Sequence, residues 1–296
     1  MELIFLGTSS MVPTKERNHS SLLIIYDGEG TLVDCGEGTQ RQLKIAGIKP
    51  SIISRILISH WHGDHVFGLP GLISTLSATD YNKPLDIFGP RETLKRFEFM
   101  EKAFVFDRKI ELNIKEIEKG MIVETSQYYI ETLPLEHGIT SLGFSFIEKD
   151  KRKINMKAVK KYKIQEGPLL GKVQMGEEIE WKGKKVSADE LSTLIRGKKI
   201  TIIADTVPTA NATILAQDAD ILVCESTYAS DMEEKAEHHN HMTAKQAAQI
   251  ANVANVKKLF LTHFSARYSN PHILEDDARD IFNNTEAAYD FKRIKI

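Results

Sequence analysis

Cysteine is scarce in this chain, which has 2 cysteines, Cys35 and Cys224, among 296 residues. Two thiols so far apart cannot make the disulfide framework of a small secreted domain, and neither belongs to a Cys-x-x-Cys metal pair. Each adjoins an apolar run, so we expect two buried free thiols.

Long apolar runs and a targeting segment are also absent. No run approaches the roughly 18 apolar residues that a membrane span needs. The first residues, MELIFLG, lack the basic region and the longer apolar stretch of a signal peptide. The sequence therefore predicts a soluble, cytoplasmic protein without a membrane partner.

An excess of positive charge is missing as well. The 39 Lys and Arg residues face 41 Asp and Glu residues, so the formal net charge is -2. Nucleic-acid-binding domains are usually basic, so this balance argues against such a partner unless positive charge is concentrated locally. A hydrophobic content of 42% is typical of a globular chain, and the length allows a sizeable core.

Short apolar strands alternate with helices along most of the sequence. Strands are predicted at 2–6, 21–26, 31–33, 55–59, 141–147, 200–204, 221–224 and 259–261. Helices are predicted at 37–46, 66–78 and 244–253, with a last long helix from Pro271. Gly28 and Gly30 mark a hairpin turn. After this hairpin-rich start, the alternation predicts stacked sheets with helices outside.

A basic segment interrupts this pattern. Residues 149–163 hold eight Lys or Arg against one acid, Asp150. The residues that follow are rich in glycine and lysine and poor in residues that form a core. We therefore expect residues 150–195 to form an arm that leaves the globular body and is not a separate domain. By itself, the charge run is explained equally well by a solvated helix face.

Four side chains that can bind a metal ion lie within six residues. His60, His62, Asp64 and His65 directly follow the apolar run 55–59. Neutral imidazole and carboxylate groups suit Zn²⁺ and related divalent cations. At a strand end, His60 and His62 can point into one site, while Asp64 and His65 reach a second site beside it. The run predicts a metal centre, although a lone histidine is usually a packed or surface residue.

Three more strand-like runs end on a residue of the same kind. These residues are His137, Asp205 and His263. Open sheets collect functional groups beyond the carboxyl ends of their strands, so we expect all three to converge with the His60–His65 run. Taken singly, a buried histidine or a turn-capping aspartate explains each residue at least as well.

At this point the chain resembles the metallo-β-lactamase superfamily, and more closely its tRNA 3′-processing branch, the ribonuclease Z family. The matching motifs are Gly7-Thr-Ser-Ser, Pro13-Thr-Lys-Glu-Arg-Asn18, Asp34-Cys-Gly-Glu-Gly-Thr-Gln40, His60–His65, His137-Gly, Gly167-Pro-Leu-Leu-Gly-Lys172, Asp205-Thr206, His241-Met-Thr243 and Thr262-His-Phe-Ser265. The His-x-His-x-Asp-His run indicates only the superfamily, whereas the other motifs together are much more specific. The resemblance implies an α/β fold, an αββα sandwich. Residues 1–296 would be one catalytic domain, with 150–195 as an inserted tRNA-binding arm.

The resemblance also implies a metal content and its ligands. Two Zn²⁺ ions per subunit are expected, with Mn²⁺ or another divalent ion possible in their place. The expected ligands are His60, His62 and His137 for the first ion, Asp64, His65 and His263 for the second, and Asp205 between them.

The implied activity is that of an endoribonuclease that removes the 3′ trailer from tRNA precursors. A hydroxide shared by the two ions would attack the phosphodiester and leave a 3′-hydroxyl on the tRNA and a 5′-phosphate on the trailer. Asp64 would accept a proton, and His241 would stabilise the transition state or protonate the leaving oxygen. The neighbouring His238 and His239 make the choice of His241 less distinct.

Substrate contacts and assembly follow from the same resemblance. Lys15, Arg17 and Asn18 would hold the acceptor stem or the nucleotides at the cut. The arm, with Gly167 and Pro168, would grip the tRNA elbow, and its basic run would neutralise phosphates. A homodimer is expected, in which the arm of one subunit presents tRNA to the active site of the other.

Some acidic and aromatic residues near these motifs receive structural roles. We expect Asp34 to bond the loop around the metal site, Glu225 to orient a ligand histidine, and Trp61 to pack. Val207 and Ala204 depart from the Arg and Gly common in the family.

Two alternatives stay open at this point. Another hydrolase of the same fold, such as a small-molecule phosphodiesterase or an arylsulfatase-like enzyme, would keep the ligands without needing the basic arm. A non-catalytic RNA-binding relative would keep the arm and lose ligands.

Overall fold

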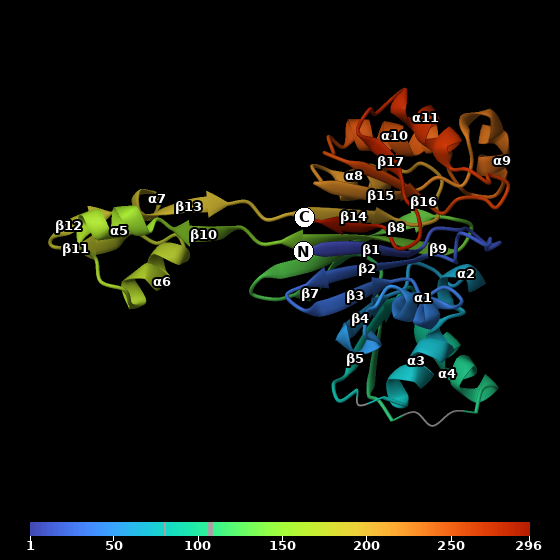
Figure 1. The fold of residues 1–296 in the computed structure, drawn as a ribbon, viewed down its shortest axis with the longest axis horizontal. Helices are drawn as coiled ribbons and strands as arrows, with labels where there is room; N and C mark the ends of the chain where they lie inside the picture. Colours follow the sequence, from blue (N-terminus) through green and yellow to red (C-terminus); the bar gives the residue numbers. More distant parts are fainter. Residues whose placement is uncertain (80, 106–108) are drawn as a thin grey trace.

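The computed structural model of the chain describes residues 1–79, 81–105 and 109–296. Within them, two seven-stranded sheets pack face to face, and a slender arm extends to one side (Figure 1). In order across the first sheet lie β18 (Arg293–Lys295), β1 (Glu2–Gly7), β2 (Ser21–Tyr26), β3 (Glu29–Val33), β4 (Ile53–Leu57), β5 (Leu85–Gly89) and β6 (Leu112–Glu116). In order across the second lie β17 (Thr285–Ala287), β16 (Leu259–Thr262), β15 (Ile221–Glu225), β14 (Lys199–Ile203), β9 (Thr140–Glu148), β8 (Tyr128–Glu136) and β7 (Gly120–Glu124).

Helices cover the outer face of each sheet. The first sheet carries α1 (Thr39–Ile45), α2 (Gly63–Val66), α3 (Leu69–Ser77) and α4 (Thr93–Ala103). The second carries α8 (Ala210–Ala216), α9 (Glu233–His238), α10 (Ala244–Val253) and α11 (His272–Arg279). The short 3-10 turns are η1 (Pro50–Ile52) and η2 (Ser230–Met232).

Three apolar clusters hold these layers together. One lies between the sheets and includes Phe5, Phe144 and Phe260. A second joins the first sheet to α1, α3 and α4, and a third joins the second sheet to α8, α10 and α11. This order of helix, sheet, sheet and helix confirms the expected αββα sandwich.

Local sequence explains several element boundaries. β2 and β3 meet in a tight turn at Asp27 and Gly28, which have positive φ of 49° and 81°. Two-residue hairpin turns with positive φ match the right-handed twist of the flanking strands. Thr243 caps α10 in a reciprocal capping box with Gln246.

Two expected helices differ from the observed ones. The helix expected over 66–78 is divided, because α2 ends at Val66 and α3 begins again at Leu69 with Pro70 in its first turn. The prediction of a long final helix is wrong, because α11 ends at Arg279. The chain then adds β17 to the second sheet and β18 to the first.

The arm contains its own secondary structure and core. It comprises β10 (Lys151–Ile154), α5 (Met156–Tyr162), α6 (Pro168–Gln174), β11 (Ile179–Trp181), β12 (Lys184–Val186), α7 (Ala188–Leu191) and β13 (Ser192–Ile195). Strands β10 and β13 pair as its stalk. Val159, Val173 and Leu191 are buried in a separate apolar cluster at its tip. The stretch after the basic run, expected to be poor in residues that form a core, contributes Val173 to this cluster.

No helix in the described part of the chain is long and apolar enough to cross a membrane.

Candidate metal centre

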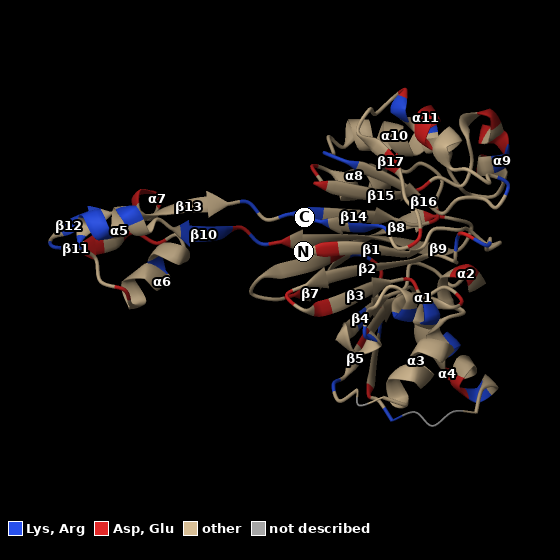
Figure 2. Ribbon diagram, viewed as in Figure 1, with Lys and Arg blue, Asp and Glu red and all other residues tan. Residues whose placement is uncertain are grey.

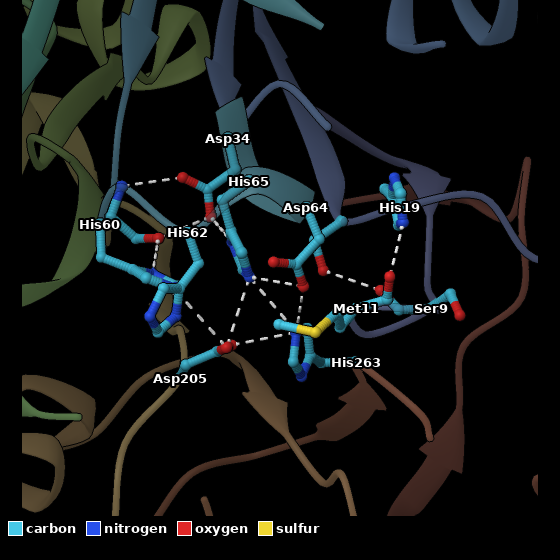
Figure 3. Close-up of polar contacts among 12 residues, drawn as sticks. Ser9, Met11, His19, Asp34, His60, His62, Asp64, His65, Asp205 and His263 are labelled. Atoms are coloured by element: carbon cyan, nitrogen blue, oxygen red, sulfur yellow. Dashed lines mark hydrogen bonds and ion pairs between the residues drawn. The ribbon is translucent and has the colours of Figure 1, made fainter. Parts of the chain in front are cut away.

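The carboxyl ends of strands from both sheets meet at one edge of the sandwich. His60 follows β4, Asp205 follows β14 and His263 follows β16, while His137 follows β8. Strands β14, β15 and β16 are parallel, so their ends lie at the same edge. The segment from His60 leads into the short helix α2. The side chains of His60, His62, Asp64 and His65 gather around Asp205 and His263 (Figure 3). The expected convergence of distant strand ends is what the fold produces.

The first group of ligand atoms surrounds His62. Its Nδ1 lies 3.1 Å from His60 Nε2 and 3.0 Å from His137 Nε2. Asp205 Oδ2 lies 3.7 Å from His60 Nε2 and 3.6 Å from His137 Nε2. Three ring nitrogens and one carboxylate oxygen therefore face a common point.

The second group lies directly beside the first. His65 Nε2 is 3.3 Å from His263 Nε2 and 3.5 Å from Asp64 Oδ2. Asp205 Oδ2 lies 3.4 Å from His65 Nε2, and its Oδ1 lies 3.3 Å from His263 Nε2. The Asp205 carboxylate thus belongs to both groups.

Hydrogen bonds behind the ligands fix which ring nitrogen faces the centre. Four histidines donate from Nδ1: His60 to Ser59 Oγ at 3.0 Å, His65 to Asp34 Oδ2 at 2.7 Å, His137 to Asn240 O at 2.7 Å and His263 to Thr227 Oγ1 at 2.9 Å. A carboxylate and a carbonyl can only accept, so the Nδ1 proton is required in the second and third pairs. Ser59 and Thr227 donate their own hydroxyl protons to Asp34 and Glu225, so their oxygens accept from the histidines. The four Nε2 lone pairs are left facing one another.

Such an arrangement fits divalent cations. Tetrahedral coordination with bonds of about 2.0–2.1 Å places ligand atoms roughly 3.3–3.4 Å apart, and the distances within both groups scatter around this value. Asp205 Oδ1 is buried and has no hydrogen-bond partner in the described residues. A buried carboxylate oxygen without a partner is costly, and a bound cation would satisfy it. The nitrogen and oxygen donor set suits Zn²⁺, Mn²⁺ and related ions.

The charges at the centre are strongly coupled. Burial would raise the pKa of Asp205, but His263 and His65 hold it well below its ordinary value. Burial would lower the pKa of His65, yet Asp205 and Asp34 raise it well above the ordinary value. Because a metal ion competes with that proton for Nε2, metal binding here should release protons.

Asp34 holds the metal-binding loop in place through hydrogen bonds to Ser59 and His65. Its Oδ1 accepts from Ser59 N at 2.8 Å, and its Oδ2 accepts from Ser59 Oγ and His65 Nδ1, each at 2.7 Å. Its backbone has a positive φ of 56°, a conformation that Asp tolerates better than most residues. The side chain is buried and makes these contacts in place of direct ligation, as expected from the sequence.

Glu225 orients His241 at the mouth of the centre. Its Oε1 accepts from His241 Nδ1 at 2.9 Å and from Thr206 N at 2.9 Å. Burial would lower the pKa of His241, but Glu225 outweighs it and raises the pKa to about 9. The His241 ring centre lies 4.8 Å from that of His137. Glu225 thus holds the His241 imidazole next to both ligand groups and favours its protonated form.

Known proteins are similar in sequence to this chain over nearly its full length. It is 36% identical to ribonuclease Z of Methanothermobacter thermautotrophicus over 297 residues, which covers 100% of this chain and 97% of that protein. It is 39% identical to ribonuclease Z of Protochlamydia amoebophila over 290 residues, covering 98% and 94%. The chain belongs to the ribonuclease Z family.

Solved structures and family models agree with this membership. Human tRNase Z, short form, has a TM-score of 0.74 and 28% identity, covering 100% of this ribonuclease Z family chain and 99% of that one. A metallo-beta-lactamase fold protein from Bacillus subtilis has a TM-score of 0.72 at 16% identity, covers 99% and 98%, and shows the fold alone. Residues 173–264 match the beta-lactamase superfamily domain. Residues 1–154 match the family described as anti-Pycsar protein Apyc1, so the chain belongs to that family as well. The chain is a metal-binding ribonuclease with the metallo-β-lactamase fold.

Not every substrate residue expected for a ribonuclease Z faces solvent. Lys15 is exposed, but Arg17 is buried and donates from Nη2 to Tyr268 O at 2.7 Å. Asn18 donates from Nδ2 to Glu37 O at 2.7 Å. Arg17 and Asn18 therefore hold the loop in shape, and Lys15 is the one of the three whose side chain is exposed.

The arm lies far from the metal centre. It leaves the body at the end of the sheets opposite α2, which carries Asp64 and His65 (Figure 1). Gly167 and Pro168 are exposed at the start of α6. Lysines and arginines gather on β10 and α5, as Figure 2 shows. The structure therefore brings the seven expected ligands and His241 together but places the arm residues elsewhere.

Sequence reasoning missed two parts of the centre. Thr227 links Glu225 to His263, and the backbone carbonyl of Asn240 accepts from His137. The only signal for Thr227 is its position two residues after Glu225, and a carbonyl acceptor leaves no signal at all. His238 and His239, which compete with His241 in the sequence, are exposed.

Proposed function

We propose that this protein cleaves tRNA precursors at the 3′ side and releases the trailer, leaving a 3′-hydroxyl on the tRNA and a 5′-phosphate on the trailer. The observation that carries the proposal is the convergence of seven ligand side chains in two adjoining groups, in a chain of the ribonuclease Z family. The cytoplasmic location expected from the sequence stays a prediction.

The two groups support a content of two Zn²⁺ ions per subunit. His60, His62 and His137 would hold one ion, and Asp64, His65 and His263 the other, with Asp205 bridging. When bound, the ions would activate the attacking water and neutralise charge on the phosphodiester.

Two residues of the chain would move protons in this reaction. Asp64 is a carboxylate at the second group, 3.4 Å from His263 Nε2, and would accept the proton of the attacking water. His241 is held protonated by Glu225 and would donate a proton to the 3′ oxygen that leaves. The opposite charges of the two side chains suit the acid and the base of one hydrolysis.

Substrate binding would use the loop 13–18 and the arm. Lys15 would contact the RNA near the cut, while Arg17 and Asn18 would fix the conformation of the loop. Gly167 and Pro168 would belong to the arm surface that meets the tRNA elbow. The lysines of α5 would neutralise RNA phosphates, which positions a substrate without reading its sequence.

We infer a homodimer in which each arm serves the partner's metal centre, because the arm points away from its own centre (Figure 1). An apolar surface beside that centre suits the dimer contact: Phe67, Phe99 and Phe104 are 64%, 57% and 53% exposed and line a hollow of about 610 Å³. Exposed apolar surface of this kind marks interaction sites.

The dimer can be tested by light scattering. Phe99→Asp should yield monomers, because it places a charge inside the apolar contact. Ile214→Asp, at an equally exposed apolar position on α8, is the matched control and should leave the mass unchanged. Equal masses for both variants and for the wild type would refute this interface.

The activity is tested with a tRNA precursor and a small phosphodiester assayed side by side. The wild type should release the trailer, and His62→Ala should lose this activity because it removes a nitrogen from the first group. Cleavage that survives His62→Ala would contradict the metal mechanism. Hydrolysis of the small ester without any action on the precursor would contradict the substrate.

A further inference from the structure

A hollow outside the metal ligands lies beside the first ligand group. Its volume is about 230 Å³. It is lined by Trp61, Pro90, Arg91, Glu92, Arg96, Ile139 and Thr140. Trp61 stands between two ligands in the sequence, and Ile139 follows His137 by two residues, so the hollow adjoins the centre.

The hollow is on the accessible side of the centre. Among the seven ligands, His62 is the one that is not buried. A substrate can therefore reach the centre past His62, and the neighbouring Trp61 is partly exposed as well.

Trp61 fastens the metal-binding loop to the start of α4. Its Nε1 donates to Thr93 Oγ1 at 2.9 Å, and its ring meets the edge of Phe97 with 5.7 Å between centres. One wall of the hollow is therefore rigidly tied to the loop that carries His60 and His62. The packing role expected for Trp61 is observed, but part of its surface is left for another contact.

Two arginines bring positive charge to this wall. The Arg96 guanidinium lies 5.8 Å from the centre of the Trp61 ring and pairs with Glu92 at 3.1 Å, in an exposed salt bridge. Such a pair contributes little to stability and can be exchanged for another anion. Arg91 is exposed and makes no hydrogen bond or ion pair with any described residue. The hollow thus combines an aromatic wall, an apolar residue in Ile139 and Arg91, which has no partner in the described part of the chain.

We propose that this hollow binds the first nucleotide of the trailer, with Arg91 and Arg96 on the phosphate that links it to the second trailer nucleotide. The inference rests on the proposed function and deepens it. An aromatic surface with arginine suits single-stranded nucleic acid, because bases stack on the ring and guanidinium groups pair with phosphate.

The position of the hollow favours the trailer over the tRNA body. Figure 3 shows His60 and His62 at one side of the centre and Met11 and His19 at the other. The loop 13–18, assigned to the tRNA, continues from Met11 and leads back to His19. An RNA strand that crosses the centre from this loop would continue past His62 into the hollow.

The test compares precursors whose trailers have one nucleotide and five nucleotides. Arg91→Glu should raise the KM for the five-nucleotide trailer about tenfold with little change in kcat, as expected for the loss of one charge-assisted contact. The effect should shrink towards none with a single trailer nucleotide, because that substrate lacks the second phosphate. The slope of log KM against log salt should also fall by about 0.7 for the longer trailer.

Lys119→Glu is the matched control, since Lys119 is exposed, between β6 and β7, and lines neither this hollow nor the apolar hollow of Phe67, Phe99 and Phe104. It should leave the KM for both precursors unchanged and also reports any effect of charge reversal on dimer mass. Equal KM values for Arg91→Glu and Lys119→Glu would overturn the inference, as would an equal effect of Arg91→Glu on both trailers. If the wild type cleaves neither precursor, the proposed function itself fails, which is a distinguishable result.

Discussion

Replacing Thr227 by valine should weaken metal binding although Thr227 is not a ligand. Its Oγ1 accepts from His263 Nδ1 at 2.9 Å and donates to Glu225 Oε2 at 2.7 Å. Valine keeps the shape and loses the hydroxyl, so the buried Nδ1 proton of His263 is left without its acceptor. An unsatisfied buried donor costs about 1–3 kcal/mol. His263 can recover part of that energy by moving its proton to Nε2, which removes the lone pair that faces the centre.

The expected loss of metal affinity is about 10–100-fold, the usual effect of deleting a partner behind a ligand histidine. The stripped protein can be titrated with Zn²⁺ in competition with a chromophoric chelator, for Thr227→Val, Thr227→Ser and the wild type. Thr227→Ser retains the hydroxyl and should bind as the wild type does. The reasoning is refuted if Thr227→Val binds both ions with wild-type affinity, or if Thr227→Ser is equally impaired.

Three further predictions follow from other contacts. Glu225→Gln removes the charge that raises the pKa of His241 to about 9, so His241 should lose its proton at lower pH. The basic limb of the profile of kcat against pH should therefore move down by more than one pH unit. An unmoved limb would exclude His241 as the acid. Replacing residues 149–197 by a two-residue turn should leave the body folded, because Glu148 N bonds Lys198 O at 2.9 Å and the two ends adjoin. This deletion should reduce precursor cleavage far more than small-ester hydrolysis, and equal losses would refute the role of the arm. Arg17→Ala should lower the melting temperature, because it empties a buried position that ties the loop 13–18 to Tyr268, and an unchanged melting temperature would contradict that role.

The convergence of the candidate metal ligands could be predicted because each is encoded locally. His60, Asp205 and His263 come shortly after the apolar strands β4, β14 and β16. Strands β14 and β16 both run parallel to β15, so their ends lie at one edge of the sheet. The αββα order could be inferred for a similar reason, from strands that alternate with helices and from the resemblance.

Other features depend on tertiary contacts that no local pattern encodes. Arg17, expected to contact the substrate, is instead buried against the carbonyl of Tyr268, about 250 residues away in sequence, and no local pattern encodes that contact. The core of the arm is built from scattered residues such as Val159, Val173 and Leu191, whose spacing follows no regular period. Helix α11 is short because the chain after it turns back to pair with both sheets. The helical pattern that begins at Pro271 does not reveal this pairing.

The central claim is that this centre, with metal bound, hydrolyses the bond between tRNA and its 3′ trailer. The most direct measurement is the chemistry of the new ends after a precursor is treated with the chelator-stripped protein and with the protein reloaded with Zn²⁺ or Mn²⁺. We predict cleavage only after reloading, with a 3′-hydroxyl on the tRNA and a 5′-phosphate on the trailer. Cleavage by the stripped protein, or a 2′,3′-cyclic phosphate on the tRNA, would contradict the account, because the ribose 2′-hydroxyl and not water would then be the nucleophile.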